Sequence, residues 1–275
     1  MSGETFETVN PGLRSADFQR ISDLLYAASR ITLQDGKEEL VKSRLLKRMR
    51  ALGIGSFGEY LARVESDPAE KYQMVDLLTT NKTSFFREDA HFDFLKTRVL
   101  PGITGGRLRI WSAGCSSGEE PCTIAMVLRE HYASGPQPDA RILATDLSKR
   151  VLARAEAGIY DEEVLRDVPP QLTQKYFDCV ETRKPRRYSA RPALRSLITF
   201  APLNLMEDWP MKGPFDVIFC RNVMIYFDKP TQERLVNRFY GLLKPGGYLF
   251  SGHSESLAGM NHNFRYVQPA VHLKG

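Results

Sequence analysis

The stretch Arg107-Leu-Arg-Ile-Trp-Ser-Ala-Gly-Cys-Ser-Ser-Gly-Glu-Glu-Pro121 decides the fold of this chain. Its apolar first part is typical of a short buried strand, and Gly114 and Gly118 allow a tight turn in which the backbone comes close to a ligand. The apolar run from Ile124 to Leu128 then continues as a buried helix. A strand, a glycine-rich turn and a helix in this order form the usual nucleotide cradle of doubly wound α/β folds.

Two carboxylates follow the turn and indicate which nucleotide it holds. Glu119 and Glu120 lie at the start of the helix, where carboxylates suit the helix dipole but would repel a pyrophosphate. They suit a cation, and S-adenosylmethionine (SAM) has a sulfonium, an ammonium and no phosphate. The next apolar strand ends at Asp146, and an acid at that position can bind the two ribose hydroxyls of an adenosine. The pattern therefore favours a SAM site over a dinucleotide site.

The composition is that of an ordinary soluble globular protein. The chain has 275 residues, of which 42% are hydrophobic and 26% charged, and its formal net charge is +5. No apolar run is long enough to span a membrane, and the N-terminus lacks the basic and apolar regions of a signal peptide. The 4 cysteines form no close CxxC pair, and the 5 histidines have no metal-ligand spacing. We therefore expect a cytoplasmic protein that is not embedded in the membrane, has reduced thiols and holds no metal.

The chain divides into a helical first part and an alternating second part. Residues 1–13 have the composition of a flexible tail. Over residues 14–100 apolar residues recur at helical spacing, which predicts an N-terminal helical domain followed by a linker. In 101–275, β-like runs alternate with helical ones, which predicts an α/β domain with a mostly parallel sheet. An arginine-rich excursion at about 178–196 is predicted to be a small inserted β subdomain. The β-like runs are 107–113, 141–145, 197–201, 215–220, 246–251 and 265–273.

Polar residues follow two of these predicted strands. The fourth run leads into Arg221, Asn222 and Tyr226, and Asn204 follows the third. In open α/β sheets, ligands lie outside the carboxyl ends of the strands, so these side chains are candidate ligand contacts. The alternative is that they cap the next helix or form turns, as asparagine often does.

The segment Thr79-Thr-Asn-Lys-Thr-Ser-Phe-Phe-Arg-Glu88 joins the two parts of the chain. It places two phenylalanines among polar residues with no clean period. Loops that carry such groups often bind ligands, so one interpretation is a lid over the site with Asn81, Thr83 and Arg87 facing the ligand. The other interpretation is a linker with a helix cap at Ser84.

A basic helix is predicted at Lys42-Ser-Arg-Leu-Leu-Lys-Arg-Met-Arg50. Arg44, Lys47 and Arg48 lie on one flank of this helix, beside its apolar side. The flank is either a solvated face or a docking surface for an acidic partner.

Five segments of the chain carry a family resemblance. They are Thr80-Asn-Lys-Thr-Ser-Phe-Phe-Arg-Glu88, Trp111-Ser-Ala-Gly-Cys-Ser-Ser-Gly-Glu-Glu-Pro121, Phe219-Cys-Arg-Asn-Val-Met-Ile-Tyr-Phe-Asp228, Leu243-Lys-Pro-Gly-Gly247 and Gly252-His-Ser-Glu255. Together they resemble the chemotaxis receptor glutamate O-methyltransferase family, CheR. The resemblance spans the chain from about Asp17 onward, and the first and third segments are specific to that family.

The resemblance implies a SAM-dependent, Rossmann-like methyltransferase sheet, an N-terminal helical domain and a small inserted β subdomain. It implies an enzyme of chemotaxis signal transduction that methylates glutamates on chemoreceptor cytoplasmic helices, with S-adenosylhomocysteine as the product. We expect a cytoplasmic monomer recruited to membrane receptors, with Arg44, Lys47 and Arg48 docking the receptor. Arg87 and Tyr226 fall where the family places groups near the methyl. The family's cofactor residues fall on Asn81, Thr83, Arg87, Glu120, Asp146, Asn204, Leu205, Arg221 and Asn222.

One departure from the family and two other functions remain open at this point. Relatives that tether to a receptor's C-terminal pentapeptide carry a glycine-containing loop in the β subdomain. Here Val180-Glu-Thr-Arg-Lys-Pro-Arg-Arg-Tyr188 contains no glycine, so we expect no such tethering. A SAM methyltransferase acting on RNA or a small molecule is one alternative, although the basic segments lack the interleaved aromatics, apart from Tyr188, that nucleic-acid binding favours. A non-catalytic SAM-sensing adaptor is the other.

Overall fold

The structure, a computed structural model, describes residues 11–34, 36–103 and 105–275. It divides into two compact units, Met1–Thr80 and Asn81–Gly275, which we call the helical unit and the sheet unit. The predicted tail, residues 1–13, lies outside the described residues as far as residue 10. In the described part of the chain, no helix is both long and apolar enough to cross a bilayer.

The helical unit confirms the periodicity of its sequence. Its helices are α1 (Ser15–Ser29), α2 (Glu38–Leu52), α3 (Phe57–Ser66) and α4 (Pro68–Leu78). Ser56 caps α3 by accepting a hydrogen bond from the Glu59 amide. Asp67 caps α4 by accepting one from the Ala69 amide, with Pro68 in the first turn. The apolar side chains at helical spacing are buried: Ile21, Leu25, Val41, Leu45, Met49, Leu61 and Val64.

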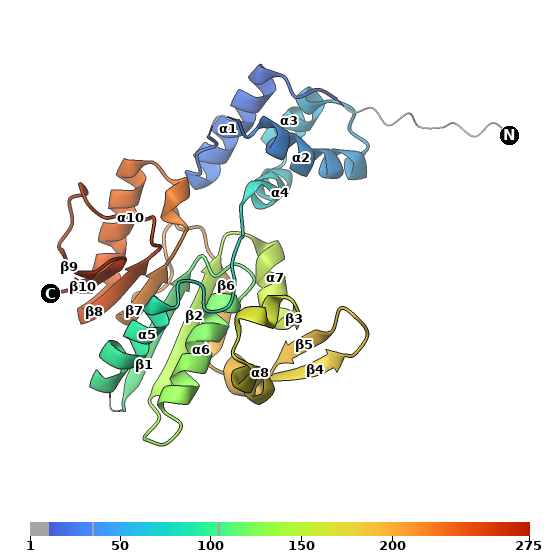
Figure 1. Ribbon diagram of the computed structural model, residues 1–275. Helices are drawn as coiled ribbons and strands as arrows, with labels where there is room; N and C mark the ends of the chain where they lie inside the picture. Colours follow the sequence, from blue (N-terminus) through green and yellow to red (C-terminus); the bar gives the residue numbers. More distant parts are fainter. Residues whose placement is uncertain (1–10, 35, 104) are drawn as a thin grey trace. The chain divides into compact units, whose positions relative to one another are not determined.

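The sheet unit is built on a mostly parallel sheet, as the alternating pattern predicts (Figure 1). Its strands are β1 (Arg107–Ala113), β2 (Asp139–Asp146), β6 (Ile198–Pro202), β7 (Phe215–Cys220), β8 (Leu243–Ser251), β9 (Phe264–Gln268) and β10 (Val271–Lys274). Within the described residues their order is β6-β2-β1-β7-β8-β10-β9. The strands from β6 to β8 run parallel, and β10 and β9 add antiparallel strands at one edge.

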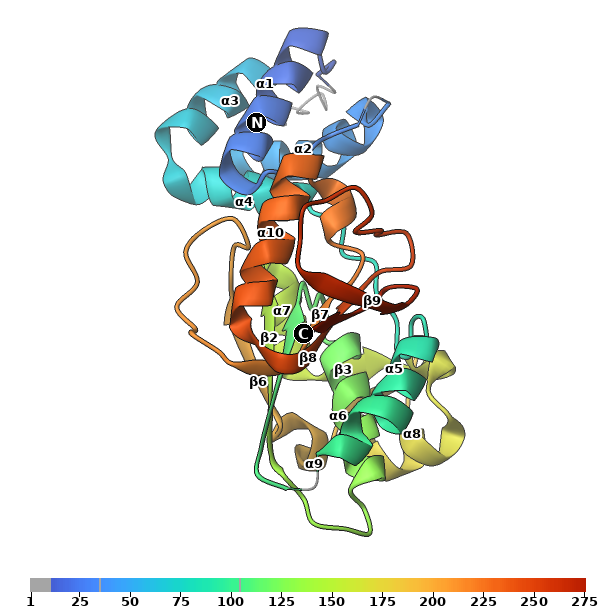
Figure 2. The same ribbon diagram turned by 90° about the vertical axis from the view of Figure 1, so that its left-hand side faces the viewer.

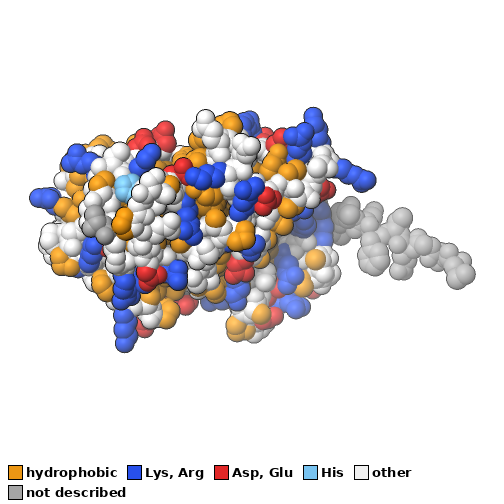
Figure 3. Space-filling view, turned by 90° about the horizontal axis from the view of Figure 1, so that it is seen from below, with side chains coloured by type: hydrophobic (Ala, Val, Ile, Leu, Met, Phe, Trp, Pro, Cys, Tyr) orange, Lys and Arg blue, Asp and Glu red, His pale blue; other side chains and the backbone are white. Residues whose placement is uncertain are grey.

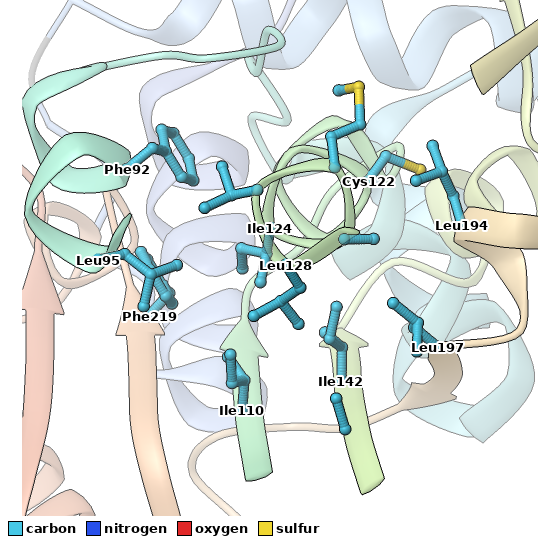
Figure 4. Packing of buried hydrophobic residues seen from close by; sticks show 14 of the residues in the cluster. Phe92, Leu95, Ile110, Cys122, Ile124, Leu128, Ile142, Leu194, Leu197 and Phe219 are labelled. Atoms are coloured by element: carbon cyan, nitrogen blue, oxygen red, sulfur yellow. The ribbon is translucent and has the colours of Figure 1, made fainter. Parts of the chain in front are cut away.

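Helices cover both faces of this sheet (Figures 1 and 2). Ile110 of β1 packs with Ile124 and Leu128 of helix α6 (Glu119–His131), as Figure 4 shows, whereas Trp111, the next residue, packs with Phe239 of helix α10 (Lys229–Leu242). Alternate side chains of a strand point to opposite faces, so each strand contributes to two apolar layers. The helical elements of this unit are α5 (Ala90–Phe94), η1 (Leu95–Val99), η2 (Leu100–Gly102), α6 (Glu119–His131), α7 (Lys149–Ala157), η3 (Val164–Asp167), α8 (Pro170–Tyr176), α9 (Pro192–Arg195), η4 (Met224–Tyr226) and α10 (Lys229–Leu242).

The segment 81–100 belongs to the sheet unit, although the sequence pattern assigned it to the helical domain and its linker. Phe85 and Phe92 are buried in the same apolar core as α6, and this burial attaches the segment to the sheet. A cap at Ser84 is not what forms, because α5 begins later and is capped by Asp89.

A second, three-stranded sheet forms the inserted subdomain. Its strands are β3 (Ile159–Asp161), β4 (Phe177–Glu181) and β5 (Arg187–Ala190), in the order β3-β5-β4. β4 and β5 pair antiparallel within the β subdomain predicted at about 178–196. β5 also pairs with β3, which the sequence does not reveal because a strand of 3 residues is too short to show alternation.

The strand order reverses between β1 and β7. From β1 the sheet continues through β2 to β6 on one side, and through β7 to β8 on the other. In open α/β sheets, ligands bind outside the carboxyl ends of the strands at such a reversal. The topology therefore brings the glycine-rich turn after β1 close to the polar residues after β7.

Candidate functional site

A buried arginine occupies the carboxyl end of β7. Arg221 Nη1 donates to Glu120 Oε2 at 3.0 Å. Arg221 Nη2 donates to Glu88 Oε2 at 3.0 Å and to the Arg87 carbonyl. The Arg221 side chain is 2% exposed, and Glu120 also accepts from Ser112 Oγ at 2.6 Å. Residues of β1, α6, β7 and the segment before α5 thus converge on one guanidinium.

The charges of this cluster do not cancel, because Glu88 and Glu120 face a single guanidinium. Burial opposes ionisation of Glu88, but the hydrogen bond from Asn222 and the charge of Arg221 outweigh burial and lower the pKa of Glu88. Glu88 is therefore ionised at neutral pH, and the cluster has a net negative charge that suits a cation. Glu119, the other glutamate at the start of α6, is turned into the protein, where burial raises its pKa.

The acid at the end of β2 holds the turn that follows β1. Asp146 Oδ2 accepts from the Ser116 amide at 2.8 Å, and Oδ1 accepts from the Ser148 amide at 2.9 Å. Ser116 Oγ in turn donates to the Asn81 carbonyl at 3.0 Å. A carboxylate oxygen can accept more than one hydrogen bond, so these backbone bonds are compatible with the predicted ribose contact. Asn81 and Asp146, far apart in the sequence, are joined through one serine.

The backbone around these side chains has an uncommon conformation. Phe86, Glu88, Ser116 and Asn222 have positive φ angles of 53°, 57°, 50° and 59°. Residues with a side chain seldom adopt such angles, and they persist where the surrounding structure fixes them, often at functional sites. Two of the four flank Arg87, whose Nη1 donates to the Lys82 carbonyl at 2.8 Å.

The other predicted contacts lie in loops that follow the strands or join the units. Asn204, just after β6, accepts from the Met206 amide at 3.0 Å, so its side chain does form the turn that the sequence left open. Leu205 is 8% exposed. Tyr226, at the end of η4, and Thr83 are half-buried. The cofactor contacts of Asn204, Leu205 and Thr83, and a position of Tyr226 near the transferred methyl group, remain predictions.

Comparison with family models decides what kind of protein this is. Residues 81–272 match the CheR methyltransferase, SAM binding domain, and residues 16–79 match the CheR methyltransferase, all-alpha domain. The chain belongs to the CheR methyltransferase family. The match makes the sheet unit the SAM-binding domain of a methyltransferase, as the glycine-rich turn and the acids after it predict. The resemblance stated from the sequence is thereby confirmed.

Curated relatives agree with this assignment. The probable chemotaxis protein methyltransferase of Rhizobium etli is 45% identical, over 86% of this chain and 91% of its own. The chemotaxis protein methyltransferase of Klebsiella aerogenes is 46% identical, over 92% of this chain and 87% of its own. That of Escherichia coli is 42% identical, over 92% of this chain and 88% of its own.

Two glutamates of this CheR domain are not singled out by the sequence reasoning. Glu88 binds Arg221 and also accepts from Asn222 Nδ2 at 3.1 Å. Glu255 accepts hydrogen bonds from the loop after β7. Both end a segment that carries the family resemblance, which is the signal that points to them, but these partners in the loop after β7 are 30 or more positions away in the sequence.

Glu88 also lies beside two histidines. Ligand atoms of Glu88, His91 and His253 lie within 4.8 Å of one another, and such a donor set suits zinc. The spacing of these residues in the sequence does not reveal the group. Both oxygens of Glu88, however, already accept hydrogen bonds, Oε2 from Arg221 and Oε1 from Asn222, so a metal ion would have to compete with these donors. That the protein needs no metal therefore remains a prediction.

In the helical unit, two residues of the predicted docking flank have partners within the unit. Arg44 Nη1 donates to the Leu78 and Thr79 carbonyls at 2.8 and 2.9 Å, at the end of α4. Arg48 Nη2 lies 2.6 Å from Glu70 Oε2, and the Glu70 side chain is 2% exposed. Lys47 is exposed. The contacts therefore give Arg44 and Arg48 a packing role, whether or not the flank also docks a partner.

The arginines of the inserted subdomain are interleaved with acids. Arg187 lies 3.7 Å from Asp161 and 3.6 Å from Glu181, and Arg191 lies 2.8 Å from Asp178. On the face drawn in Figure 3, Lys and Arg side chains are scattered among acidic and apolar ones. Such a surface lacks the continuous basic track that follows a nucleic-acid backbone.

Proposed function

We propose that this CheR-family chain transfers the methyl group of SAM to glutamate side chains on chemoreceptor cytoplasmic helices. The products would be glutamate methyl esters and S-adenosylhomocysteine. The observation that carries the proposal is the match of both units to the two CheR domains, together with relatives named chemotaxis protein methyltransferase. The protein would act as a cytoplasmic monomer that is recruited to membrane receptors.

The donor set at the strand ends fits the cofactor. The negative cluster around Arg221 suits the sulfonium and the ammonium, and Asp146 lies at the strand end where an acid binds ribose hydroxyls. Bound SAM supplies an electrophilic methyl group. We assign the cofactor contacts to Asn81, Thr83, Arg87, Glu120, Asp146, Asn204, Leu205, Arg221 and Asn222.

The proposed reaction requires little acid–base catalysis by the protein. The acceptor glutamate is already ionised at neutral pH, so one of its oxygens bonds to the methyl carbon as the methyl–sulfur bond breaks, without a general base. The protein has to orient the reactants and exclude water. We propose that Arg87 mainly orients the cofactor and that Tyr226 orients the acceptor glutamate. A strong Arg87 pairing with the acceptor carboxylate would weaken it as a nucleophile.

Docking of the receptor is assigned to the basic flank of α2, which comprises Arg44, Lys47 and Arg48. Methyl-accepting helices carry glutamates, so a basic surface complements them. Because Arg44 and Arg48 also bind within the helical unit, Lys47 would contribute the most accessible charge.

Tethering to a receptor's C-terminal pentapeptide is not part of the proposal. The connection between β4 and β5 contains no glycine, and a glycine there can adopt backbone angles that other residues resist. Receptors with and without the pentapeptide should then be methylated at equal rates. Low-micromolar binding of the free pentapeptide, or a large loss of rate on truncation, would contradict this part.

The experiment that tests the function is methyl transfer from labelled SAM to purified receptor cytoplasmic domain. Base-labile label in the receptor supports the proposal. Label in RNA or a small molecule would make the chain a different methyltransferase, and SAM binding without turnover on any acceptor would make it an adaptor.

Asp146→Ala should cost roughly 1.5–3 kcal/mol of SAM binding free energy, as for other hydrogen bonds to charged groups. An unchanged dissociation constant in a folded variant would remove Asp146 from the site.

A further inference from the structure

Glu255 gathers backbone amides from two loops onto one buried carboxylate. Its Oε2 accepts from the Asn222 amide at 2.8 Å and from the Gly252 amide at 2.6 Å, and its Oε1 accepts from the Ile225 amide at 3.1 Å. The residue is 6% exposed. Buried carboxylates are rare unless they are paired or hydrogen-bonded, and these backbone donors satisfy that requirement.

The bonds of Glu255 join the ends of β7 and β8. Asn222 and Ile225 follow β7, and Gly252 follows β8. Gly252 allows the close approach, because a Cβ added there would lie 2.8 Å from the Asn222 nitrogen and 2.8 Å from Glu255 Oε2. The glycine and the glutamate of the Gly252-His-Ser-Glu255 segment therefore act on the same point of the β7 loop.

This part of the loop after β7 carries Arg221 and Asn222, which we assign to the cofactor. Asn222 has a φ of 59°, a left-handed conformation that few residues with a side chain adopt, although asparagine does so more often than most, and the bond from its amide to Glu255 helps to hold it there. With its backbone so held, Asn222 donates from Nδ2 to Glu88, which also binds Arg221. Glu255 is therefore bonded to the backbone of a residue, Asn222, that we assign to the cofactor.

We propose that Glu255 is a positioning residue of the SAM site, which fixes the left-handed turn at Asn222 and so presents Arg221 and Asn222 to the cofactor. This inference rests on the proposed assignment of Arg221 and Asn222 to SAM. Glu255 itself touches no reacting group. Its loss should weaken SAM binding while the fold of the sheet unit is retained.

The test compares SAM affinity in two glutamate variants, by calorimetry at a temperature where each is folded. Glu255→Ala should raise the SAM dissociation constant at least about tenfold, the size expected for losing hydrogen bonds to a charged group. Glu255→Gln should recover part of this loss, because the amide oxygen can take the place of Oε2 and keep the bonds from Asn222 and Gly252. The acceptor KM, measured at saturating SAM, should stay at the wild-type value in both.

The matched control is Glu233, whose Oε2 accepts from the Asn261 amide at 2.9 Å and so also fixes a loop of the sheet unit. Glu233→Ala should leave SAM affinity unchanged. If Glu255→Ala does not fold, Gly252→Ala probes the same bonds from the other loop and should raise the SAM dissociation constant by itself. A SAM affinity that Glu255→Ala and Gly252→Ala leave at the wild-type value would overturn the inference.

A double-mutant cycle with Asn222→Ala separates this inference from the assignment beneath it. If Glu255 acts through Asn222, the double variant should lose less than the product of the two single losses. If the two losses of SAM affinity are independent, or if Glu255→Ala weakens SAM binding and Asn222→Ala does not, Glu255 does not act through Asn222. If Asn222→Ala and Arg221→Met both leave SAM affinity unchanged, the proposed cofactor residues are wrong. If either weakens SAM binding and Glu255→Ala does not, only the role of Glu255 fails.

Discussion

Each unit contains an ion pair between an arginine and buried or half-buried glutamate, and the two ion pairs differ in the charge that remains unbalanced. In the helical unit, one guanidinium meets one carboxylate: Arg48 binds Glu70, which also accepts from Tyr60 Oη at 3.1 Å. In the sheet unit, the Arg221 guanidinium meets the carboxylates of Glu88 and Glu120. The first pairing is complete and holds helices together. The second places two carboxylates against one guanidinium, beside backbone with positive φ angles, and this arrangement suits the cationic cofactor that we propose.

The largest effect should come from removing the shared guanidinium. Arg221→Met leaves two carboxylates without their partner in a buried place, and breaking a buried pair costs about 3–5 kcal/mol of unfolding free energy. Urea unfolding followed by tryptophan fluorescence measures this loss, because Trp111 and Trp209 both lie in the sheet unit. SAM binding should be lost as well.

Arg48→Met is the matched change in the helical unit. It should destabilise that unit but leave the affinity of the sheet unit for SAM at the wild-type value. A wild-type urea midpoint for Arg221→Met would show that the two carboxylates do not depend on the guanidinium.

The two units should lose stability over different ranges of acidic pH. His91 and His272 are 0% and 6% exposed, and burial lowers the pKa of each from 6.5 to about 4. The unfolded chain binds protons that the folded sheet unit excludes, so this unit should lose up to about 3 kcal/mol per histidine as the pH falls from about 6.5 to 4. In the helical unit, the hydrogen bond from Arg48 lowers the pKa of Glu70, so its contribution is lost only as the pH falls below about 4.5.

Fluorescence and far-ultraviolet circular dichroism, recorded between pH 7 and 4, should therefore show the sheet unit losing stability first. All 5 histidines of the chain lie in that unit. His91→Phe should flatten the pH dependence of the fluorescence transition. Equal loss of stability in both units over this range would contradict the assignment of buried, neutral histidines.

Much of the fold, and part of the site, is already visible in the sequence. β1 and the start of α6 have the bounds that the glycine-rich turn predicts, since alternation and glycine positions are local signals. The role of Arg48 is not visible, because helical spacing identifies a flank but not the neighbouring helix that carries Glu70. Glu255 is missed for the same reason: its partners Asn222 and Ile225 become neighbours only when β7 and β8 pair.

Arg87 should affect turnover more than stability. Its side chain is half-buried and donates to the Lys82 carbonyl at 2.8 Å, and the residues on both sides of it have positive φ. Arg87→Ala should lower the rate of methylation by about 100-fold, the size expected when a reacting group is misplaced by about 1 Å. The melting temperature should stay close to that of the wild type. Near-normal turnover would leave the loop as a connection between the units.

The smallest effect should come from the exposed charge of the helical unit. Lys47 and Arg50 are exposed on α2, so Lys47→Glu with Arg50→Glu changes the surface while the bonds of Arg44 and Arg48 stay in place. If α2 docks the acidic receptor helix, the double reversal should raise the KM for receptor severalfold at low salt and leave SAM affinity unchanged. The difference from the wild type should shrink as salt rises, because exposed charges are screened over about 10 Å at 0.1 M ionic strength. Arg63→Glu with Lys71→Glu, elsewhere in the same unit, controls for net charge. An equal rise in KM for the α2 double variant and for the control double variant would show that net charge, and not a docking surface on α2, determines the affinity for receptor. No rise in KM for either double variant would show that this face of α2 is only solvated.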